Sequence, residues 1–355
     1  MNIFDTVITI DKDYYIQSHY PISKTLLFDI ETTGFSPDYT TCYLIGLMYF
    51  DDNTNQWILR QYFNDDGESE LQIIKEFMEF SLSYQYLFNF NGDGFDIPYL
   101  FKKIAEYHLE WNFHHLESVD LYKAIKPYKK SLYLDSLKQK SIEQFLCIDR
   151  EDKYSGGDLI EVYKTYLKNH NPDLLKFLLQ HNFEDVEGLF LISEILCYRD
   201  LFSGCFIATS ANIIDQRLII NLLLDYPIPK RISKGNNQMI LTGINNDVTL
   251  NIPIIFDELK FYFKDTSNYY YLPSEDKAIH KSVATYVDKE YRVKAKKSNC
   301  YVKKNGAYVR EYNGENFICY KKDYQSKESY IDVEESLLSD LTQVTKYARH
   351  IIKYI

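Results

Sequence analysis

Acidic residues occur at three separated places in the chain where they could bind divalent cations together. The first is FDIE (residues 28–31), the second is a glycine-rich run that ends at Asp96, and the third is HNFED (residues 181–185). Hydrolysis of a phosphodiester with two metal ions needs about four carboxylates around ions ~3.5–4 Å apart, because hard divalent cations take oxygen ligands. The candidate metal ligands are therefore Asp29, Glu31, Asp96 and Asp185.

The local structure expected at each place would point these side chains at a common site. Residues 24–31 form a short apolar run ending in two acids, which indicates a buried strand. Residues two apart in a strand face the same side, so Asp29 and Glu31 project together. The glycines before Asp96 predict a turn that delivers this residue to the start of a helix. In the helical stretch around HNFED, a spacing of four places His181 and Asp185 on one face, one turn apart.

The pattern of apolar residues predicts an α/β fold in which a mixed five-stranded sheet is flanked by helices. The turn-rich DDNTN between two apolar segments indicates that the first three strands form an antiparallel meander. The strands are expected at 24–31, 42–50, 56–63, 84–91 and 116–121, and the helices at 68–81, after Pro98, at 131–146, 158–168 and 171–198. This order of elements is that of a ribonuclease H-like domain.

The three acidic segments also resemble the motifs of a known family. FDIETTG, FNGDGFDIPYL and HNFEDVEGL match, in order, the three motifs of the DEDD exonucleases, and they are most similar to the YprB-like branch of the ribonuclease H-like superfamily. The segment between the last two motifs resembles the connecting segment of that branch, including Arg150, Asp152 and Gly156. The resemblance covers residues 24–198. It implies a 3′→5′ exonuclease that needs two Mg²⁺ or Mn²⁺ ions and acts on DNA or RNA with a 3′ end.

The resemblance also implies a role for each matching residue. Asp29 would bridge both ions, Glu31 and Asp185 would complete the first metal site, and Asp96 would hold the second. His181 would activate the attacking water. The backbone at Thr32 and Gly34 would lie close to the terminal nucleotide, and Asn91 and Asn182 could line the site as further substrate-binding residues. One departure concerns His181, which is separated from Asp185 by three residues, the spacing of the tyrosine-type enzymes, whereas histidine-type enzymes usually have four.

Three other interpretations of the same residues stay open at this point. The acids could be helix caps and solvated surface groups, and His181 could be a structural side chain. The protein could be a nucleic-acid-binding or regulatory module with little turnover. A hydrolase of small nucleotides would use the same ions. The complete set of four acids with a histidine favours the exonuclease, and an assay with labelled nucleic acids would separate these alternatives.

Charge and composition change along the chain and divide it into two regions. The net charge is −11, yet residues 201–355 carry a small excess of Lys and Arg. We expect a ribonuclease H-like domain at 1–203 and an accessory domain at 204–355, beginning with a helix near 218–224. In the accessory domain a basic cluster of Lys296, Lys297, Lys303 and Lys304 is interleaved with tyrosines. Such a cluster could neutralise phosphates and stack bases, although runs of charge are commonly solvated faces.

The cysteines and the apolar segments limit the class of protein. The six cysteines are far apart in sequence and lack the close pairs of a zinc or iron–sulfur site, so we expect reduced thiols. No apolar run approaches the ~18 residues of a membrane span, and the first thirty residues do not resemble a signal peptide. The expectation is a cytoplasmic protein that does not enter a membrane, and the sequence predicts no particular protein partner.

Overall fold

The computed structural model describes two compact units. It covers residues 1–110, 114–151, 156–236, 238–312 and 317–355, so that Asp152 lies outside the described residues. The first unit comprises Met1–Arg199 and Ile228–Lys230, and the second comprises Asp200–Pro227 and Arg231–Ile355. Among the described residues, none of the helices combines the length and the apolar character needed to cross a bilayer.

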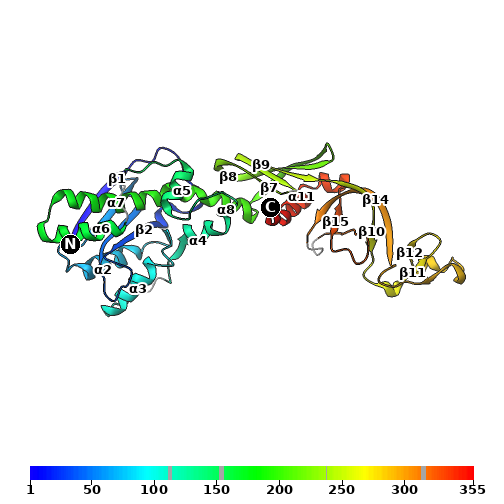
Figure 1. The fold of residues 1–355 in the computed structure, drawn as a ribbon, viewed down its shortest axis with the longest axis horizontal. Coiled ribbons are helices and arrows are strands. Elements are labelled where there is room, and N and C mark those ends of the chain that lie inside the picture. Colours follow the sequence, from blue (N-terminus) through cyan, green and yellow to red (C-terminus); the bar gives the residue numbers. More distant parts are fainter. Residues whose placement is uncertain (111–113, 152–155, 237, 313–316) are drawn as a thin grey trace. The chain divides into compact units, whose positions relative to one another are not determined.

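The first unit is an α/β domain, shown in blue to green in Figure 1. Its strands are β1 (Asn2–Ile8), β2 (Thr25–Thr32), β3 (Cys42–Asp51), β4 (Gln56–Phe63), β5 (Tyr86–Asn89) and β6 (Glu117–Asp120). Its helices are α1 (Tyr15–His19), α2 (Glu70–Ser81), α3 (Asp96–Glu106), α4 (Leu121–Ile125), α5 (Gln139–Leu146), α6 (Gly156–Asn169) and α7 (Pro172–Ile192), and α8 (Leu196–Ser203) leads into the second unit.

The six strands of this unit form one mixed sheet in the order β1-β4-β3-β2-β5-β6. The expected meander is confirmed, because β3 pairs antiparallel with both β2 and β4, while β5 pairs parallel with β2 and β6. The prediction of five strands was wrong by one. The additional strand, β1, pairs antiparallel with β4 at the sheet edge, and most of its side chains are exposed, so its sequence carries no buried apolar pattern.

Helices cover both faces of the sheet (Figure 1). On one face, Leu26, Phe28 and Ile30 of β2 pack in a buried cluster with residues of α2 and α3. On the other face, the side chains of β3 and β4 pack against α6 and α7. Since side chains alternate along a strand, Asp29 and Glu31 point to the face that α7 covers. The core packing therefore decides which helix meets the two acids.

The second unit is built mainly from antiparallel strands and contains the sheets β7-β8-β9, β10-β14-β15 and β12-β11-β13. The strands are β7 (Phe206–Ile214), β8 (Arg217–Gly235), β9 (Ile240–Pro253), β10 (Ile255–Tyr262), β11 (Tyr269–Leu272), β12 (Lys277–His280), β13 (Val293–Lys294), β14 (Tyr301–Glu311) and β15 (Ser329–Asp332). The helices are α9 (Lys281–Ala284), α10 (Glu335–Ser339) and α11 (Leu341–Ile351).

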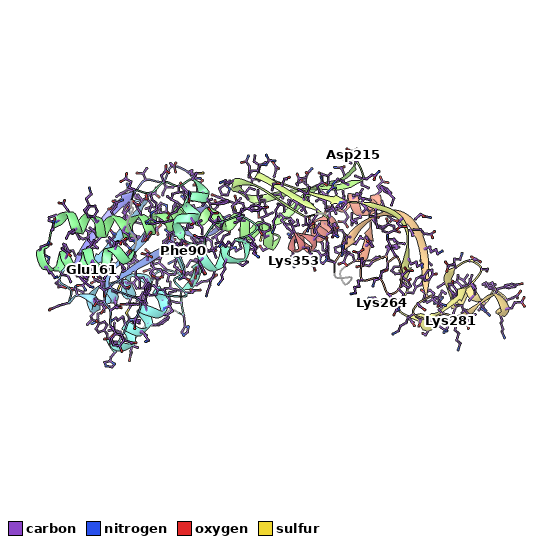
Figure 2. The ribbon with its side chains drawn as sticks, in the orientation of Figure 1. Phe90, Glu161, Asp215, Lys264, Lys281 and Lys353 are labelled. Atoms are coloured by element: carbon purple, nitrogen blue, oxygen red, sulfur yellow. The ribbon has the colours of Figure 1, made fainter. Side chains whose placement is uncertain are left out.

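The prediction of a helix near 218–224 is wrong, because these residues belong to β8. Leu218, Ile220, Leu222 and Leu224 are buried and the residues between them are more exposed, which is the two-residue period of a strand. The intervening residues are also largely apolar, so the alternation is hidden in the sequence. Asp215, labelled in Figure 2, and Gln216 join β7 to β8 with positive φ angles of 47° and 60°, as a tight hairpin turn requires.

Candidate active site

The first two acids lie at the end of β2, facing α7. Asp29 is partly buried and accepts a hydrogen bond from Asn182 Nδ2 at 3.1 Å. The amide of Asn182 is held in turn by Gln61, whose Nε2 donates to Asn182 Oδ1 at 2.9 Å. Glu31 is 7% exposed and accepts from the Tyr43 hydroxyl at 3.5 Å. Both carboxylates are thus oriented by neighbours from the sheet and from α7.

Asp96 is delivered to the same region by a tight turn between β5 and α3. The side chain of Asn89 shapes this turn by accepting a hydrogen bond from the Gly92 amide at 2.9 Å, and a Cβ on Gly92 would lie 2.7 Å from that side chain. Asn91 adopts the left-handed conformation with φ 60°. Asp96 then begins α3, is 6% exposed, and its carboxylate accepts from the backbone N–H of Ile30 on β2.

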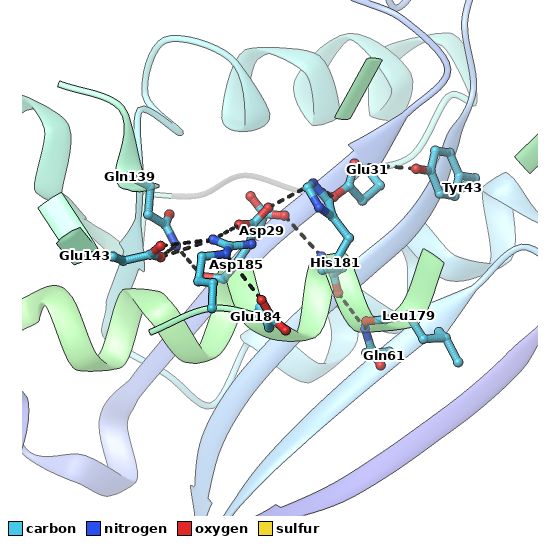
Figure 3. Close-up of polar contacts among 12 residues, drawn as sticks. Asp29, Glu31, Tyr43, Gln61, Gln139, Glu143, Leu179, His181, Glu184 and Asp185 are labelled. Atoms are coloured by element: carbon cyan, nitrogen blue, oxygen red, sulfur yellow. Dashed lines mark hydrogen bonds and ion pairs between the residues drawn. The ribbon is translucent and has the colours of Figure 1, made fainter. Parts of the chain in front are cut away.

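The third contribution comes from the middle of α7. His181 is 5% exposed, and its Nε2 lies 3.3 Å from Asp185 Oδ2 and 3.5 Å from Glu31 Oε1 (Figure 3). Single ligand atoms of Glu31, His181 and Asp185 all lie within 4.8 Å of one another. Helical spacing therefore places His181 and Asp185 together, one turn apart, and the sheet brings Glu31 to them.

The electrostatics of this cluster fit a site for cations. Burial, followed by the charges of Asp185, Asp96 and Glu31, raises the pKa of Asp29 well above its usual value. Burial also raises the pKa of Asp96 to about 7, against the backbone hydrogen bonds that lower it. Buried carboxylates that repel one another are stabilised by a nearby positive charge, and oxygen-rich sets of this kind suit Mg²⁺ or Mn²⁺. The four acids and their surroundings are therefore suited to divalent metal ions.

The residues expected to contact the terminal nucleotide occupy different positions. Asn182 is fully buried beside Asp29 and orients its carboxylate, and a contact of Asn182 with the nucleotide stays a prediction. The Thr32 hydroxyl donates to the Gly34 carbonyl at 2.9 Å, which fixes the backbone after β2. A Cβ on Gly34 would lie 2.8 Å from Thr40 Cγ2, so this close approach requires glycine. Asn91 is exposed next to the Asp96 turn.

The four lysines of the basic cluster in the second unit do not form one group. Lys296 and Lys297 lie in an exposed stretch before β14. Lys303 and Lys304 are consecutive in β14 and therefore point to opposite faces of its sheet. Lys303 Nζ lies 2.6 Å from Asp276 Oδ2, and Lys304 Nζ lies 2.7 Å from Asp332 Oδ2. Carboxylates of the same unit thus offset two of the four charges, and a role in binding nucleic acid stays a prediction.

Two features of the site were not assigned a role from the sequence. Arg150 NH1 lies 2.7 Å from Asp185 Oδ1, although only the resemblance of the connecting segment had pointed to this residue. Phe35, next to Gly34, is 90% exposed, and its ring meets that of Phe95 edge to face at 6.0 Å. Phe95, which directly precedes Asp96, is partly buried against the core, so Phe35 is the exposed ring of this pair. The adjacency of both phenylalanines to the motifs was a signal that the sequence already contained.

Comparison with known proteins concerns mainly the first unit. The sequence model of the RNase H superfamily matches residues 26–197, which include all four acids and His181. No curated protein matches the chain. One similar solved structure is the family B DNA polymerase from the hyperthermophilic archaeon Pyrobaculum calidifontis, with 13% identity, a TM-score of 0.38, and coverage of 70% of this chain and 35% of the polymerase. Another is E. coli Exonuclease I in complex with a dT13 oligonucleotide, with 11% identity, a TM-score of 0.35, and coverage of 61% of this chain and 54% of the exonuclease.

Proposed function

Because residues 26–197 of this chain match the sequence model of the RNase H superfamily, we propose that the protein is a metal-dependent nuclease. The observation that carries this proposal is the convergence of carboxylates from β2, α3 and α7. Ligand atoms of Glu31, His181 and Asp185 lie within 4.8 Å of one another, and the charges of Asp185, Asp96 and Glu31 add to burial in raising the pKa of Asp29. A purely structural role would not require four acids to be held against their mutual repulsion in a largely buried site.

The finer proposal is a 3′→5′ exonuclease that uses two Mg²⁺ or Mn²⁺ ions. The order and spacing of the three motifs support it. Asp29 would be shared between the ions, Glu31 and Asp185 would hold one of them, and Asp96 would hold the other. When bound, the ions supply Lewis acidity at the scissile phosphate and neutralise the charge that develops there. The chain itself contributes the fixed orientation of the acids through Asn182, Tyr43 and the backbone of Ile30.

His181 would accept the proton of the attacking water. It is the histidine beside the acids, and the helix holds its Nε2 close to Asp185 and Glu31. Those carboxylates would stabilise the imidazolium that results from proton transfer. A positioned general base of this kind contributes about 10²–10⁴-fold to a rate.

The aromatic pair of Phe35 and Phe95 would hold the end of the substrate. An exposed phenylalanine ring offers a face on which a nucleobase can stack without regard to its identity. Gly34 precedes Phe35 and Asp96 follows Phe95, so a base stacked there would place its phosphate close to the acids. DNA or RNA is therefore the proposed substrate, and the resemblance of the three motifs favours a 3′ end.

The proposal is tested with an isosteric variant and a matched control from the same turn. Asp96→Asn removes an anionic ligand, whereas Asp93→Asn changes an acid that is bound to Lys123 at 2.6 Å and to Ser118 at 2.5 Å. With Mn²⁺ and a 5′-labelled oligonucleotide, the parent and Asp93→Asn should produce a ladder of shortened products. Asp96→Asn, or any of the proteins in EDTA, should leave the oligonucleotide intact.

Other outcomes of this assay would replace the proposal. Direct release of a labelled mononucleotide from the 5′-labelled substrate would indicate hydrolysis in the 5′→3′ direction. Hydrolysis of free nucleotides but not of oligonucleotides would indicate a hydrolase of small nucleotides. Tight binding without products in Mn²⁺ or Mg²⁺ would indicate a nucleic-acid-binding module. Parallel DNA and RNA substrates, single-stranded and duplex, would define the substrate class.

A further inference from the structure

A buried arginine connects the candidate metal site to a second group of acids. Arg150 is located between α5 and α6, and its side chain is 10% exposed. Its NH1 lies 2.7 Å from Asp185 Oδ1 and 3.1 Å from Glu143 Oε1, and its Nε lies 3.3 Å from Glu184 Oε2. Figure 3 shows the three carboxylates, which come from α5 and α7. One guanidinium is therefore shared between a proposed metal ligand and two other acids.

The surroundings fix this arrangement from both helices. Gln139 Nε2 donates to Glu143 Oε1 at 3.0 Å and to the backbone carbonyl of Asp185 at 2.9 Å, so α5 is tied to α7 at the level of the site. A Cβ on Gly188 would lie 2.5 Å from Glu143 Oε1 and 2.6 Å from Gln139 Nε2, so glycine allows the two helices to approach. Gln180 Nε2 holds Glu184 at 2.6 Å.

The two oxygens of Asp185 have different partners. Oδ1 accepts a hydrogen bond from Arg150, whereas Oδ2 lies 3.3 Å from His181 Nε2, on the side where Glu31 completes the cluster. A carboxylate held in this way cannot rotate without breaking a charge-assisted hydrogen bond. The guanidinium is planar and rigid, so its contacts with Asp185 and Glu143 through NH1 and with Glu184 through Nε are held in one fixed geometry, which orients Asp185 as well as neutralising it.

We infer that Arg150 is a positioning residue that presents Asp185 to a divalent cation through Oδ2 alone. The inference rests on the proposed function, because it assigns Asp185 to a metal ion. The inference also assigns a positioning role to Glu143, since this carboxylate holds the guanidinium of Arg150 in place from α5. Loss of such supporting partners commonly weakens metal binding or activity by about 10–100-fold.

The alternative is that Arg150 only joins α5 to α7, or acts only through its charge. Lysine keeps the charge but lacks the planar guanidinium, so Arg150→Lys and Arg150→Gln separate these cases. If the guanidinium positions Asp185, both variants should bind Mn²⁺ about 10–100-fold more weakly than the parent. A purely electrostatic role would leave Arg150→Lys unchanged and make Arg150→Gln bind Mn²⁺ more tightly. A purely structural role would lower the melting temperature and leave Mn²⁺ affinity unchanged.

The experiment measures Mn²⁺ binding to the full chain by titration calorimetry or electron paramagnetic resonance, together with melting temperature. Lys103→Gln is the matched control, because Lys103 is 4% exposed and pairs with Glu70 and Glu106 at 3.3 Å. This control should lose stability and keep its Mn²⁺ affinity. Glu143→Gln removes the support of Arg150 without touching Asp185, and it should weaken Mn²⁺ binding by a smaller factor, which provides a test if the Arg150 variants do not fold.

The possible outcomes distinguish the two proposals. The positioning role is overturned if folded Arg150→Lys and Arg150→Gln bind Mn²⁺ as tightly as the parent. If those variants do not fold, an unchanged Mn²⁺ affinity of Glu143→Gln overturns it. Either result leaves the nuclease proposal standing. Tighter binding by Arg150→Gln overturns the positioning role as well. A parent protein that binds Mn²⁺ no better than Asp29→Asn overturns both. Weakened binding in the variants with an unaffected Lys103→Gln supports both.

Discussion

Replacing Asp96 with asparagine should stabilise the metal-free protein while abolishing hydrolysis. The carboxyl is 6% exposed, and burial raises its pKa from 3.8 to about 7. A change of one in pKa corresponds to ~1.36 kcal/mol, so ionised Asp96 costs the folded state about 4 kcal/mol at pH 8. Asparagine keeps the shape and still accepts from the Ile30 N–H, but its amide nitrogen needs a partner. We therefore expect a gain in unfolding free energy of about 2–4 kcal/mol.

The dependence of this gain on pH follows from the direction of the shift. The pKa of Asp96 is higher in the folded than in the unfolded state, so between pH ~4 and ~7 the folded protein binds the proton more tightly. The metal-free parent should consequently lose stability as the pH rises through this window. The pKa of Asp29 is raised in the same direction, so the variant keeps part of this slope. The difference between the two proteins should be small at pH 4 and largest at pH 8.

Urea unfolding in EDTA, followed by circular dichroism at pH 4.5, 6 and 8, measures this difference. Asp93→Asn serves again as the control, and its stability relative to the parent should not follow the same pH course. Added Mn²⁺ should raise the stability of the parent more than that of Asp96→Asn, because a ligand stabilises only the state that binds it. An Asp96→Asn protein that is no more stable than the parent at pH 8 in EDTA would refute the reasoning.

Three further predictions concern single residues. His181→Ala should lower single-turnover hydrolysis by about 10²–10⁴-fold in a protein with parental circular dichroism, and a parental rate would return His181 to a structural role. Gly46→Ala should lower the free energy of unfolding, measured by urea unfolding, by about 1–3 kcal/mol, because a Cβ would lie 2.1 Å from Asn182 Oδ1. Unchanged stability would mean that α7 can shift to make room for the Cβ. Phe35→Ala should raise KM for single-stranded substrate by the loss of about 1–3 kcal/mol of stacking, without lowering the melting temperature, because the ring is 90% exposed; an unchanged KM would contradict the stacking role.

The parts of the fold set by local pattern could be predicted from the sequence. The meander of β2, β3 and β4 follows from short apolar runs and a polar turn, and the structure confirms it. Strand alternation correctly placed Asp29 and Glu31 on one face. Helical spacing likewise predicted that His181 and Asp185 lie one turn apart, as the 3.3 Å separation of their side chains shows. In each case the signal lies within a few residues of the side chain concerned.

Features that depend on distant residues could not be predicted in this way. The position of Asn182 behind Asp29 results from the packing of α7 over the sheet, where Gly46 leaves room for its amide. The ion pairs of Lys303 and Lys304 depend on strand neighbours that are distant in sequence. β8 was mistaken for a helix because apolar residues occupy both of its faces between Leu218 and Leu224. Residue type alone does not specify such partners.

The close fit between α7 and the sheet bears on how the protein would exchange its cations. Asn182 faces Gly46 with no space for a Cβ, and one residue of slippage would move the helix by ~1.5 Å. This contact and the hydrophobic core therefore resist a shift of α7 along the sheet, and with it a change in the position of Asp185 relative to Asp29. We therefore expect folding and metal loading to be separate events in such a scaffold, in contrast to small domains that fold only around their metal. Chelation should leave a folded protein that regains its ions without refolding.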